Sequence, residues 1–385
     1  MQTKKLGELA TFINGFAFKP TDWGDTGLPI IRIQDLTGNS YRKNYYEGKY
    51  SKKIEINNGD VLISWSASLG VYIWNRGKAL LNQHIYKVIF DKVNIDKNYF
   101  VYAVRFNLDK MALKTHGATM KHIVKNDFYN IDIPFPNQEI QNKISAVLSK
   151  VESIIEYRKQ QLEQLDLLIK SRFIEMFGDP ISNPQGWPVK RLEELSLLIT
   201  NGNTPKGGSK NYVNKGILFL RSQNVWKNRI DLEDVAYIDL NTHANMSKSS
   251  VHDKDILITK TGRINTENSS LGRAALFRGA DNSANINGHV YLVRLDDTVV
   301  PEYVVAILTG EAYRKYIRKV CVGGIDKRQI NLDQVENFPI ILPPKEKQKQ
   351  FAIFATQIDK SKLAIQKSIE KLEILKKSLM QKYFG

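Results

Sequence analysis

The stretch Pro136–Gly178, PNQEIQNKISAVLSKVESIIEYRKQQLEQLDLLIKSRFIEMFG, has a second, diverged copy in this chain of 385 residues. A shift of 207 residues places it without a gap on Pro343–Gly385. Eleven positions from Ile133 onward are then identical, and the last two residues of each copy are among them. A register of this length without a gap indicates that the segment was duplicated.

Apolar side chains recur every three or four residues in both copies, which is typical of one face of a long helix. The positions are Ile144, Val147, Val151, Ile154, Leu162, Leu165, Leu168, Phe351, Phe354, Ile358, Ile365, Ile369, Leu372, Leu375 and Leu379. Each helix would be roughly 55 to 60 Å long, too long to pack on one small domain, so we expect the two faces to pack together. Two unrelated surface helices are the alternative, and the ungapped repeat argues against it.

The segments that precede the helices also resemble each other, although with gaps. The corresponding runs are Lys5–Leu9 with Arg191–Leu195, Asn14-Gly15 with Asn201-Gly202, Ile30–Asp35 with Phe219–Asn224, Gly59–Ser64 with Lys254–Thr259, and Asn82–Tyr86 with Asn287–Tyr291. Short runs rich in Ile, Val and Tyr between Gly and Asn turns predict strands. Helical patterns follow at Tyr99–Lys114 and Pro301–Val320. Each half is therefore predicted to be an α+β domain followed by a long helix, with residues 178–188 as an ordered connector anchored by a Trp.

Composition indicates a folded, basic protein. The chain is 42% hydrophobic and 10% aromatic, with a formal net charge of +16. A charge of this size favours an anionic partner, most often nucleic acid. The single cysteine, Cys321, excludes an internal disulfide and fits a reducing compartment. The first ten residues do not read as a signal sequence and no run is long enough to cross a bilayer, so we expect a soluble, cytoplasmic protein of a prokaryote.

Sequence patterns of catalytic sites are missing. Residues 202–210 contain glycines and lysines but not in the order of a phosphate-binding loop, so they are interpreted as a flexible basic loop near DNA. The six histidines show no metal-ligand spacing. Neither the Asn-Pro-Pro-aromatic stretch of an adenine methyltransferase nor a glycine-rich cofactor loop occurs. The chain is therefore predicted to be non-catalytic.

The order of domain, helix, domain and helix resembles the specificity subunit of type I restriction-modification enzymes. The residues that carry the resemblance are Ile133–Pro136 with Gln138–Gln141, the junction Met176–Pro180 with Asn183-Pro184, Gly186-Trp187 and Leu192–Leu195, and the loops Gly117–Ile123 and Gly324–Ile330. The likeness extends over essentially the whole chain. The second loop has Asp326 where the first has Thr119, which departs from a shared pattern.

The resemblance implies a DNA reader built from four parts. Residues 1–135 and 179–342 would be two target recognition domains, and 136–178 and 343–385 two long conserved helices packed as an antiparallel coiled coil with pseudo-twofold symmetry. Such a subunit reads a bipartite, asymmetric site on double-stranded DNA. It recruits two modification subunits, which use S-adenosylmethionine to methylate adenine, and restriction subunits, which translocate with ATP and Mg. No membrane partner, cofactor or metal site is expected on this chain.

Residues common to both halves and residues that differ suit different contacts with DNA. Phosphate contacts position a protein without specifying sequence, so shared residues are candidates for phosphate contact or for domain architecture. These are Arg32 with Arg221, Gln34 with Gln223, and Lys121 with Arg328. His84 and His289, which are also equivalent, are interpreted as structural, with a base contact as the alternative.

Loops that differ between the halves are the candidates for base reading. Arg, Lys and Asn suit guanine or adenine edges in the major groove, and aromatic side chains could stack or act as wedges. The candidates are Arg42, Lys43, Tyr45, Ser64, Trp65, Thr119, Thr204, Lys206, Lys210, Lys260, Thr261, Arg263 and Lys327. Solvated loop residues without a role remain the alternative for each. The target bases do not follow from the sequence, because loop contacts obey no one-residue code.

Two other functions stay open at this level. A self-sufficient DNA enzyme is disfavoured by the missing motifs. A basic coiled-coil adaptor that binds DNA non-specifically, or that binds an acidic protein, is the alternative to the specificity subunit.

Overall fold

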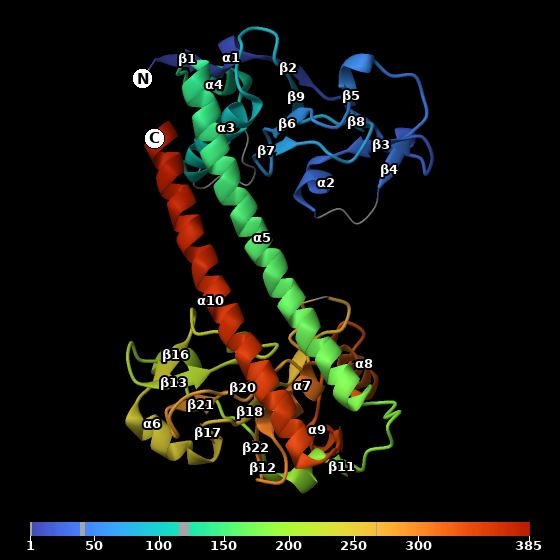
Figure 1. Ribbon diagram of the computed structural model, residues 1–385, viewed down its shortest axis with the longest axis vertical. Helices are drawn as coiled ribbons and strands as arrows, with labels where there is room; N and C mark the ends of the chain where they lie inside the picture. The colour runs from blue at the N-terminus through green and yellow to red at the C-terminus, as the bar shows by residue number, and fades with distance from the viewer. Residues whose placement is uncertain (1, 39–42, 115–122, 267) are drawn as a thin grey trace. The chain divides into compact units, whose positions relative to one another are not determined.

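The computed structural model describes residues 2–38, 43–114, 123–266 and 268–385, without the side chains of residues 110–114. The chain forms two compact units, Met1–Lys159 with Gln366–Gly385, and Gln160–Ile365. We call them unit 1 and unit 2. Figure 1 shows that each contains a globular α+β part and segments of two long helices.

Unit 1 contains two four-stranded sheets and one two-stranded sheet. Their strand orders are β2-β9-β6-β7, β4-β3-β8-β5 and β1-β10. The strands are β1 (Thr3–Lys5), β2 (Thr11–Asn14), β3 (Leu28–Ile31), β4 (Asn44–Tyr46), β5 (Glu55–Ile56), β6 (Val61–Ser64), β7 (Gly70–Ile73), β8 (Ala79–Leu81), β9 (Ile85–Ile89) and β10 (Asp132–Pro134). The helices are α1 (Leu6–Leu9), η1 (Pro20–Asp22), α2 (Ile33–Thr37), η2 (Lys52–Ile54), α3 (Lys97–Lys114) and α4 (Lys125–Tyr129).

Unit 2 repeats these three sheets in the same order. They are β12-β22-β18-β20, β16-β13-β21-β17 and β11-β25, and two small sheets, β14-β15 and β19-β24-β23, are added. The strands are β11 (Val189–Arg191), β12 (Ser196–Asn201), β13 (Ile217–Leu220), β14 (Val225–Trp226), β15 (Arg229–Ile230), β16 (Ala236–Ile238), β17 (Ser250–Val251), β18 (Ile256–Thr259), β19 (Thr261–Arg263), β20 (Ala274–Leu276), β21 (Ala284–Ile286), β22 (Val290–Leu295), β23 (Val322–Gly323), β24 (Lys327–Gln329) and β25 (Pro339–Ile341). The helices are η3 (Leu192–Leu195), η4 (Gly208–Asn211), η5 (Ser222–Asn224), α6 (Leu240–Asn245), η6 (Ser247–Ser249), α7 (Pro301–Thr309), α8 (Glu311–Val320) and α9 (Leu332–Glu336).

Buried contacts are duplicated along with the topology. Gln141 and Gln348 are each only 1% exposed, and each donates from Nε2 to the carbonyl of the proline five residues earlier (2.8 Å in both). Each side-chain oxygen accepts from a backbone N–H at 3.0 Å, that of Asp96 in unit 1 and that of Val300 in unit 2. The predicted duplication of the whole half is therefore confirmed.

The two long helices, α5 (Gln138–Phe177) and α10 (Lys345–Phe384), run antiparallel where they pair. In unit 1, Lys376 Nζ lies 2.6 Å from the Glu152 carboxylate, and the earlier Glu373 pairs with the later Lys159 at 3.9 Å. Glu152 also accepts hydrogen bonds from Tyr102 (2.8 Å) and Arg105 (3.0 Å) of α3. The helix pair is thereby joined to its own domain.

The pairing in unit 2 follows the same direction. Lys362 Nζ lies 2.5 Å from Asp166, and the ring of Phe351, earlier in α10, packs against those of Phe173 and Phe177, later in α5. These aromatic rings join the buried core of unit 2. The predicted packing of the two helical faces is confirmed.

The predicted apolar face of α5 was wrong in detail. Val147 is 42% exposed, whereas the adjacent Leu148 is fully buried, and Ile155 is more buried than Ile154. The buried apolar residues of this segment are at positions 144, 148, 151 and 155. Helix α5 must pack both on the domain core and on α10, and this selects these positions. Leu168 and Leu375, which were also assigned to the face, are exposed.

The helical pattern at Pro301–Val320 is two helices rather than one. The break is at Gly310, whose extended backbone (φ −64°, ψ 153°) ends α7 and begins α8. The connector after α5 is ordered as predicted: Trp187 donates from Nε1 to the carbonyl of Phe177 (3.1 Å) and from its N–H to Asn183 (2.9 Å).

Candidate nucleic-acid interface

In unit 1, Trp65 directly follows the last residue of β6, an inner strand of the sheet β2-β9-β6-β7. Its N–H donates to the carbonyl of His84 (3.2 Å), and its carbonyl accepts from the N–H of Ile123 (3.1 Å). The indole stacks on the ring of Tyr86, with 5.7 Å between centroids, and its Nε1 donates to Asn14 Oδ1 (3.3 Å). The ring is therefore held in one orientation while part of it faces solvent.

In unit 2, Lys260 follows β18 at the equivalent place. Its N–H donates to the carbonyl of His289 (2.9 Å), and its carbonyl accepts from the N–H of Ile330 (2.9 Å). The ammonium lies 5.5 Å from the ring centroid of Tyr291, which corresponds to the tyrosine beneath Trp65. One backbone position, held by matching hydrogen bonds over a matching tyrosine, thus carries an aromatic ring in one unit and a cation in the other.

A glycine fixes the loop beside this position in both units. The N–H of Gly15 donates to the carbonyl of Ile85, the first residue of β9, and that of Gly202 donates to the carbonyl of Val290, the first residue of β22, at 3.0 Å in each case. A Cβ would come within 2.0 Å of a carbonyl oxygen at Gly15 and within 2.1 Å at Gly202. Only glycine allows so close an approach of two backbone segments, and this explains the shared Asn-Gly pairs.

Four predicted residues of unit 2 lie on the small sheet β19-β24-β23, and a fifth, Lys260, directly precedes β19. In the register of β19 and β24, Thr261 faces Gln329, Gly262 faces Arg328 and Arg263 faces Lys327. Arg263 forms an exposed ion pair with Asp326 (3.2 Å). Lys260, Lys327 and Arg328 are further cations of this surface, so its net charge is positive. The residues brought together are Lys260, Thr261, Arg263, Lys327 and Arg328.

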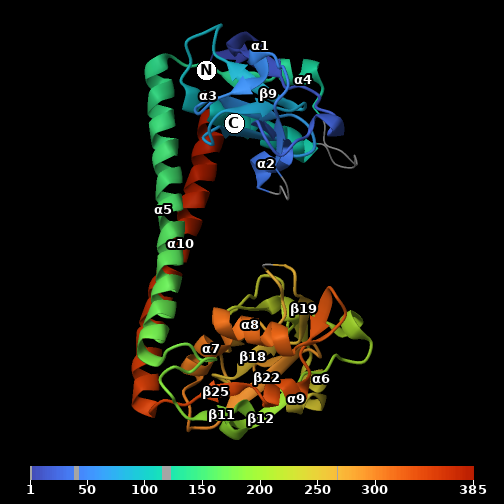
Figure 2. The same cartoon turned by 90° about the vertical axis from the view of Figure 1, so that its right-hand side faces the viewer.

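Helix α8 adds cations that the sequence reasoning missed. Tyr313 and Ile317 are buried, whereas Lys315, Arg318 and Lys319 are exposed. Figure 2 shows α8 and β19 on the same side of unit 2, away from β11 and β12. Apolar residues four apart with cations between them were the signal that could have identified this basic face.

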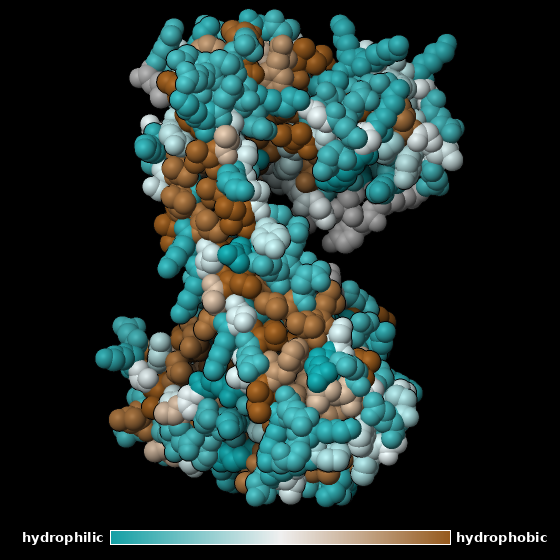
Figure 3. Space-filling model, viewed as in Figure 1, coloured by the Kyte–Doolittle hydropathy of each residue, from teal (hydrophilic) through white to brown (hydrophobic). Residues whose placement is uncertain are grey.

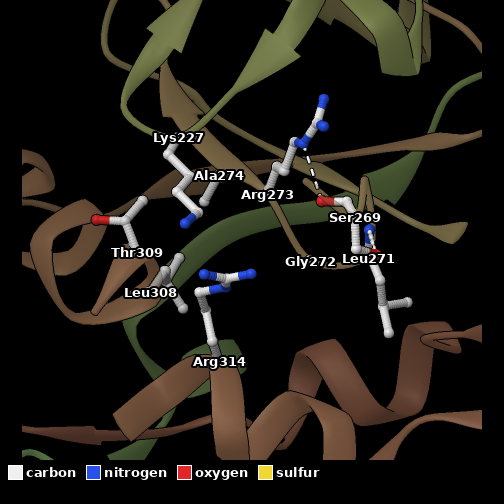
Figure 4. A pocket seen from close by; sticks show the side chains of 9 residues that line it. All are labelled: Lys227, Ser269, Leu271, Gly272, Arg273, Ala274, Leu308, Thr309 and Arg314. Atoms are coloured by element: carbon white, nitrogen blue, oxygen red, sulfur yellow. Dashed lines mark hydrogen bonds between the residues drawn. The ribbon is translucent and has the colours of Figure 1, made fainter. Parts of the chain in front are cut away.

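The loop between β19 and β20 is anchored by a buried arginine, Arg273. Its guanidinium lies 3.9 Å from the ring centroid of Trp226, and its Nε donates to the carbonyl of Ser269 (3.0 Å). Burial, together with the neighbouring charge of Arg314, lowers the pKa of Arg273. Figure 4 shows Lys227 and Arg314 reaching into the adjacent pocket while the guanidinium of Arg273 points away from it. Arg273 is thus a support for the loop.

Arg32 and Arg221, predicted as an equivalent pair, are held by local contacts. Arg32 donates from its N–H to Asp35 Oδ2 (2.9 Å), and its guanidinium lies 5.5 Å from the ring of Trp23. Arg221 donates to the carbonyl of Asp234 (2.7 Å) and forms an ion pair with its carboxylate (3.3 Å). These contacts support the architectural interpretation of the pair more than phosphate contact.

The other predicted residues are placed as follows. Ser64 is fully buried, and its hydroxyl donates to the carbonyl of Ser68 (2.5 Å). Gln34 is exposed on α2, Lys43 is exposed before β4, and Tyr45 is half-buried in β4. In unit 2, Gln223 donates to Asp234 (2.5 Å), whereas Thr204, Lys206 and Lys210 are exposed around η4. Arg42, Thr119 and Lys121 lie outside the described residues.

A known family model covers nearly the whole chain. The type I restriction modification DNA specificity domain matches residues 1–167 and 184–375. The chain belongs to this family of DNA specificity domains. The two matches fall on the two halves of the repeat, so the family and the duplicated scaffold agree.

Relatives of this family of specificity domains align along most of the chain. The type I restriction enzyme MjaVIII specificity subunit of Methanocaldococcus jannaschii is 23% identical over 343 residues, 86% of this chain and 79% of the relative. The MjaIX specificity subunit of the same organism is 23% identical over 407 residues, 98% of this chain and 90% of the relative.

Solved structures show the same fold. The type I restriction-modification S subunit from M. genitalium has a TM-score of 0.59 at 14% identity, with 100% of this chain and 96% of that chain covered. A chain from work on complex assembly and conformational transition of the type I R-M system has a TM-score of 0.54 at 17% identity, with 100% and 97% covered. The predicted fold class and the predicted resemblance are thereby confirmed.

Residues 2–38, 43–114, 123–266 and 268–385 hold no group of three or more His, Cys, Asp or Glu that could bind a metal. Within the same ranges, every helix is too short or too polar to span a bilayer. The backbone carbonyls of His84 and His289 accept the N–H groups of Trp65 and Lys260, and the role of the two imidazoles stays a prediction.

Proposed function

We propose that this chain is the DNA-reading subunit of a type I restriction-modification complex and that it recognises a bipartite, asymmetric site on double-stranded DNA. Residues 1–135 and 179–342 would each read one half-site. The observation that carries the proposal is the position shared by Trp65 and Lys260. A scaffold duplicated down to its hydrogen bonds presents different side chains at the same place, as two readers of different base pairs require.

The two side chains suit different contacts in the major groove. A lysine ammonium donates to the O6 and N7 acceptors of guanine, whereas an aromatic ring offers an apolar surface to the thymine methyl group. The exposed cations of α8 and β24 in unit 2 supply charge for phosphate contacts, which position the domain without specifying sequence. The net charge of +16 is in keeping with binding to a polyanion.

Partner subunits would supply the chemistry. We propose that the long helices recruit two modification subunits, which bind S-adenosylmethionine, and that restriction subunits using ATP and Mg join them. Figure 3 shows apolar side chains exposed along α5 and α10, and such exposure is characteristic of surfaces that bind other proteins. The exposed apolar residues of the two helices include Val147, Leu167, Leu168, Ile174, Ile353, Leu363, Ile374 and Leu375. The chain itself would neither methylate nor cleave DNA.

Exchange of one domain tests the proposal. Residues 1–135 are replaced by the corresponding domain of a relative, and methylated adenines are mapped in DNA exposed to the assembled complex. We expect one half-site to change and the other to stay the same, and the reciprocal result when residues 179–342 are exchanged. A simultaneous change of both half-sites would show that the domains do not read independently. Methylation that is independent of sequence would favour the non-specific adaptor.

A further inference from the structure

Ile325 is presented to solvent at the tip of a hairpin in unit 2. The hairpin joins β23 and β24, and the side chain of Ile325 is 89% exposed. No other large apolar side chain in the described part of the chain is exposed to this extent, the next being Leu197 at 72% and Leu240 at 71%. A single exposed apolar residue is common in proteins, so the case for a function rests on the residues that surround Ile325.

The hairpin around Ile325 is fixed by contacts on both sides. Asp326 accepts the Arg263 guanidinium at 3.2 Å, and its carbonyl accepts the N–H of Ile264, also at 3.2 Å. Arg328 donates from Nε to the carbonyl of Gly324 (3.2 Å). Gly323 takes a positive φ of 123°, which a side chain would strain. The tip of the hairpin is therefore fixed by hydrogen bonds and an ion pair, and the side chain of Ile325 projects from it into solvent.

Cations surround the apolar tip. Arg263 and Lys327 are exposed and directly paired across β19 and β24, and Arg328 faces Gly262 one step away. The nearby acidic residue, Asp326, is engaged by Arg263. In the major groove of DNA the apolar methyl group of thymine lies between two rows of negatively charged phosphates. An apolar residue among cations is complementary to such a surface.

We infer that Ile325 contacts the C5-methyl group of a thymine in the major groove of the half-site read by unit 2. Aliphatic groups recognise thymine in the major groove by apolar contact, and Ile325 offers such a group at the exposed tip of the β23-β24 hairpin. The inference rests on the proposed function and deepens it by naming the residue and the chemical group that it reads. In the 207-residue register the first half has Ala118 at this position, a shorter apolar side chain.

Substitution of thymine by uracil tests the inference, because uracil lacks only the C5-methyl group. The half-site of unit 2 is first identified by domain exchange, and each of its thymines is then replaced singly. Burial of one methyl group contributes about 0.8 kcal/mol, so we expect the wild-type modification complex to bind about fourfold more weakly at one position. With Ile325→Ala the uracil effect at that position should disappear, and with Ile325→Val it should be intermediate.

Leu240→Ala is the matched control, since Leu240 is a similarly exposed apolar residue of unit 2. It should retain the full uracil effect. The inference is overturned if the complex with Ile325→Ala keeps the uracil effect, or if it binds all sequences equally more weakly. Either of these results, combined with a domain exchange that still changes one half-site, would refute the role of Ile325 and leave the proposed function intact.

Discussion

The buried glutamines Gln141 and Gln348 provide a quantitative test of the duplication. Replacement of either by alanine removes two hydrogen bonds and leaves a backbone N–H and a backbone carbonyl without partners. A buried polar group left unsatisfied costs about 1 to 3 kcal/mol, so each variant, with two such groups, should lose about 2 to 6 kcal/mol of unfolding free energy. For a domain of this size this corresponds to a fall in Tm of about 4 to 24 °C.

The two substitutions should act on different units. Gln141→Ala should weaken hydrogen-exchange protection in unit 1, and Gln348→Ala should do so in unit 2, by similar amounts. Calorimetry and urea unfolding measure the magnitude, and hydrogen exchange assigns it to a unit. In the double variant the losses should add, because the two side chains share no partner.

Gln164→Ala is the control, since Gln164 is exposed on the same helix as Gln141. It should change the unfolding free energy by less than about 0.5 kcal/mol. The reasoning is refuted if Gln141→Ala is no less stable than Gln164→Ala, or if both buried substitutions destabilise the same unit.

Three further predictions concern pH, base preference and salt. Burial raises the pKa of Glu152, but hydrogen bonds from Lys376 and Tyr102 more than offset this, so its pKa is lowered on folding. A carboxyl group whose pKa is lowered on folding stabilises the fold at pH values above its unfolded pKa of about 4.3, and this stabilisation is lost as the pH falls through the folded pKa. The difference in unfolding free energy between wild type and Glu152→Gln should therefore be largest at neutral pH and shrink below about pH 4, as measured by urea unfolding. Trp65→Lys should change the preferred half-site of unit 1 alone, by about 1 to 3 kcal/mol at one base pair, because Tyr86 can support an ammonium as Tyr291 supports that of Lys260; an unchanged methylation pattern in a folded variant would contradict this. DNA affinity should fall by about three to five decades between 50 and 200 mM salt if six to ten phosphates are contacted, and a shallow dependence in filter-binding or anisotropy titrations would rule out that number of contacts.

Helix packing shows where the sequence pattern reaches its limit. Apolar spacing predicted two long helices that pack together, and both are present. The same spacing assigned Val147 and Ile154 to the packed face, whereas Leu148 and Ile155 are buried. A pattern of three and four steps is compatible with both choices. The domain core, which α5 must also cover, selects between them.

The candidate interface shows the same division. Sequence comparison marked Trp65 and Lys260 as residues of loops that differ between the halves. It carried no information on the tyrosine beneath each side chain or on the backbone partners at Ile123 and Ile330, because those contacts join segments far apart in the chain. The basic face of α8 was missed because Pro301–Val320 was interpreted as a single helix.

The sequence by itself determined the duplication, the two long helices, the α+β halves and the family, because each depends on local periodicity or on an ungapped register. Only the tertiary structure decided which side chains are presented and which are used for support. Ser64 and Trp65 are neighbours in the chain, yet one is buried and the other partly exposed. Ile325 is exposed because β24 pairs with β19, more than sixty residues earlier in the chain. Such pairings depend on the packing free energy of the whole domain, which no short stretch of sequence contains.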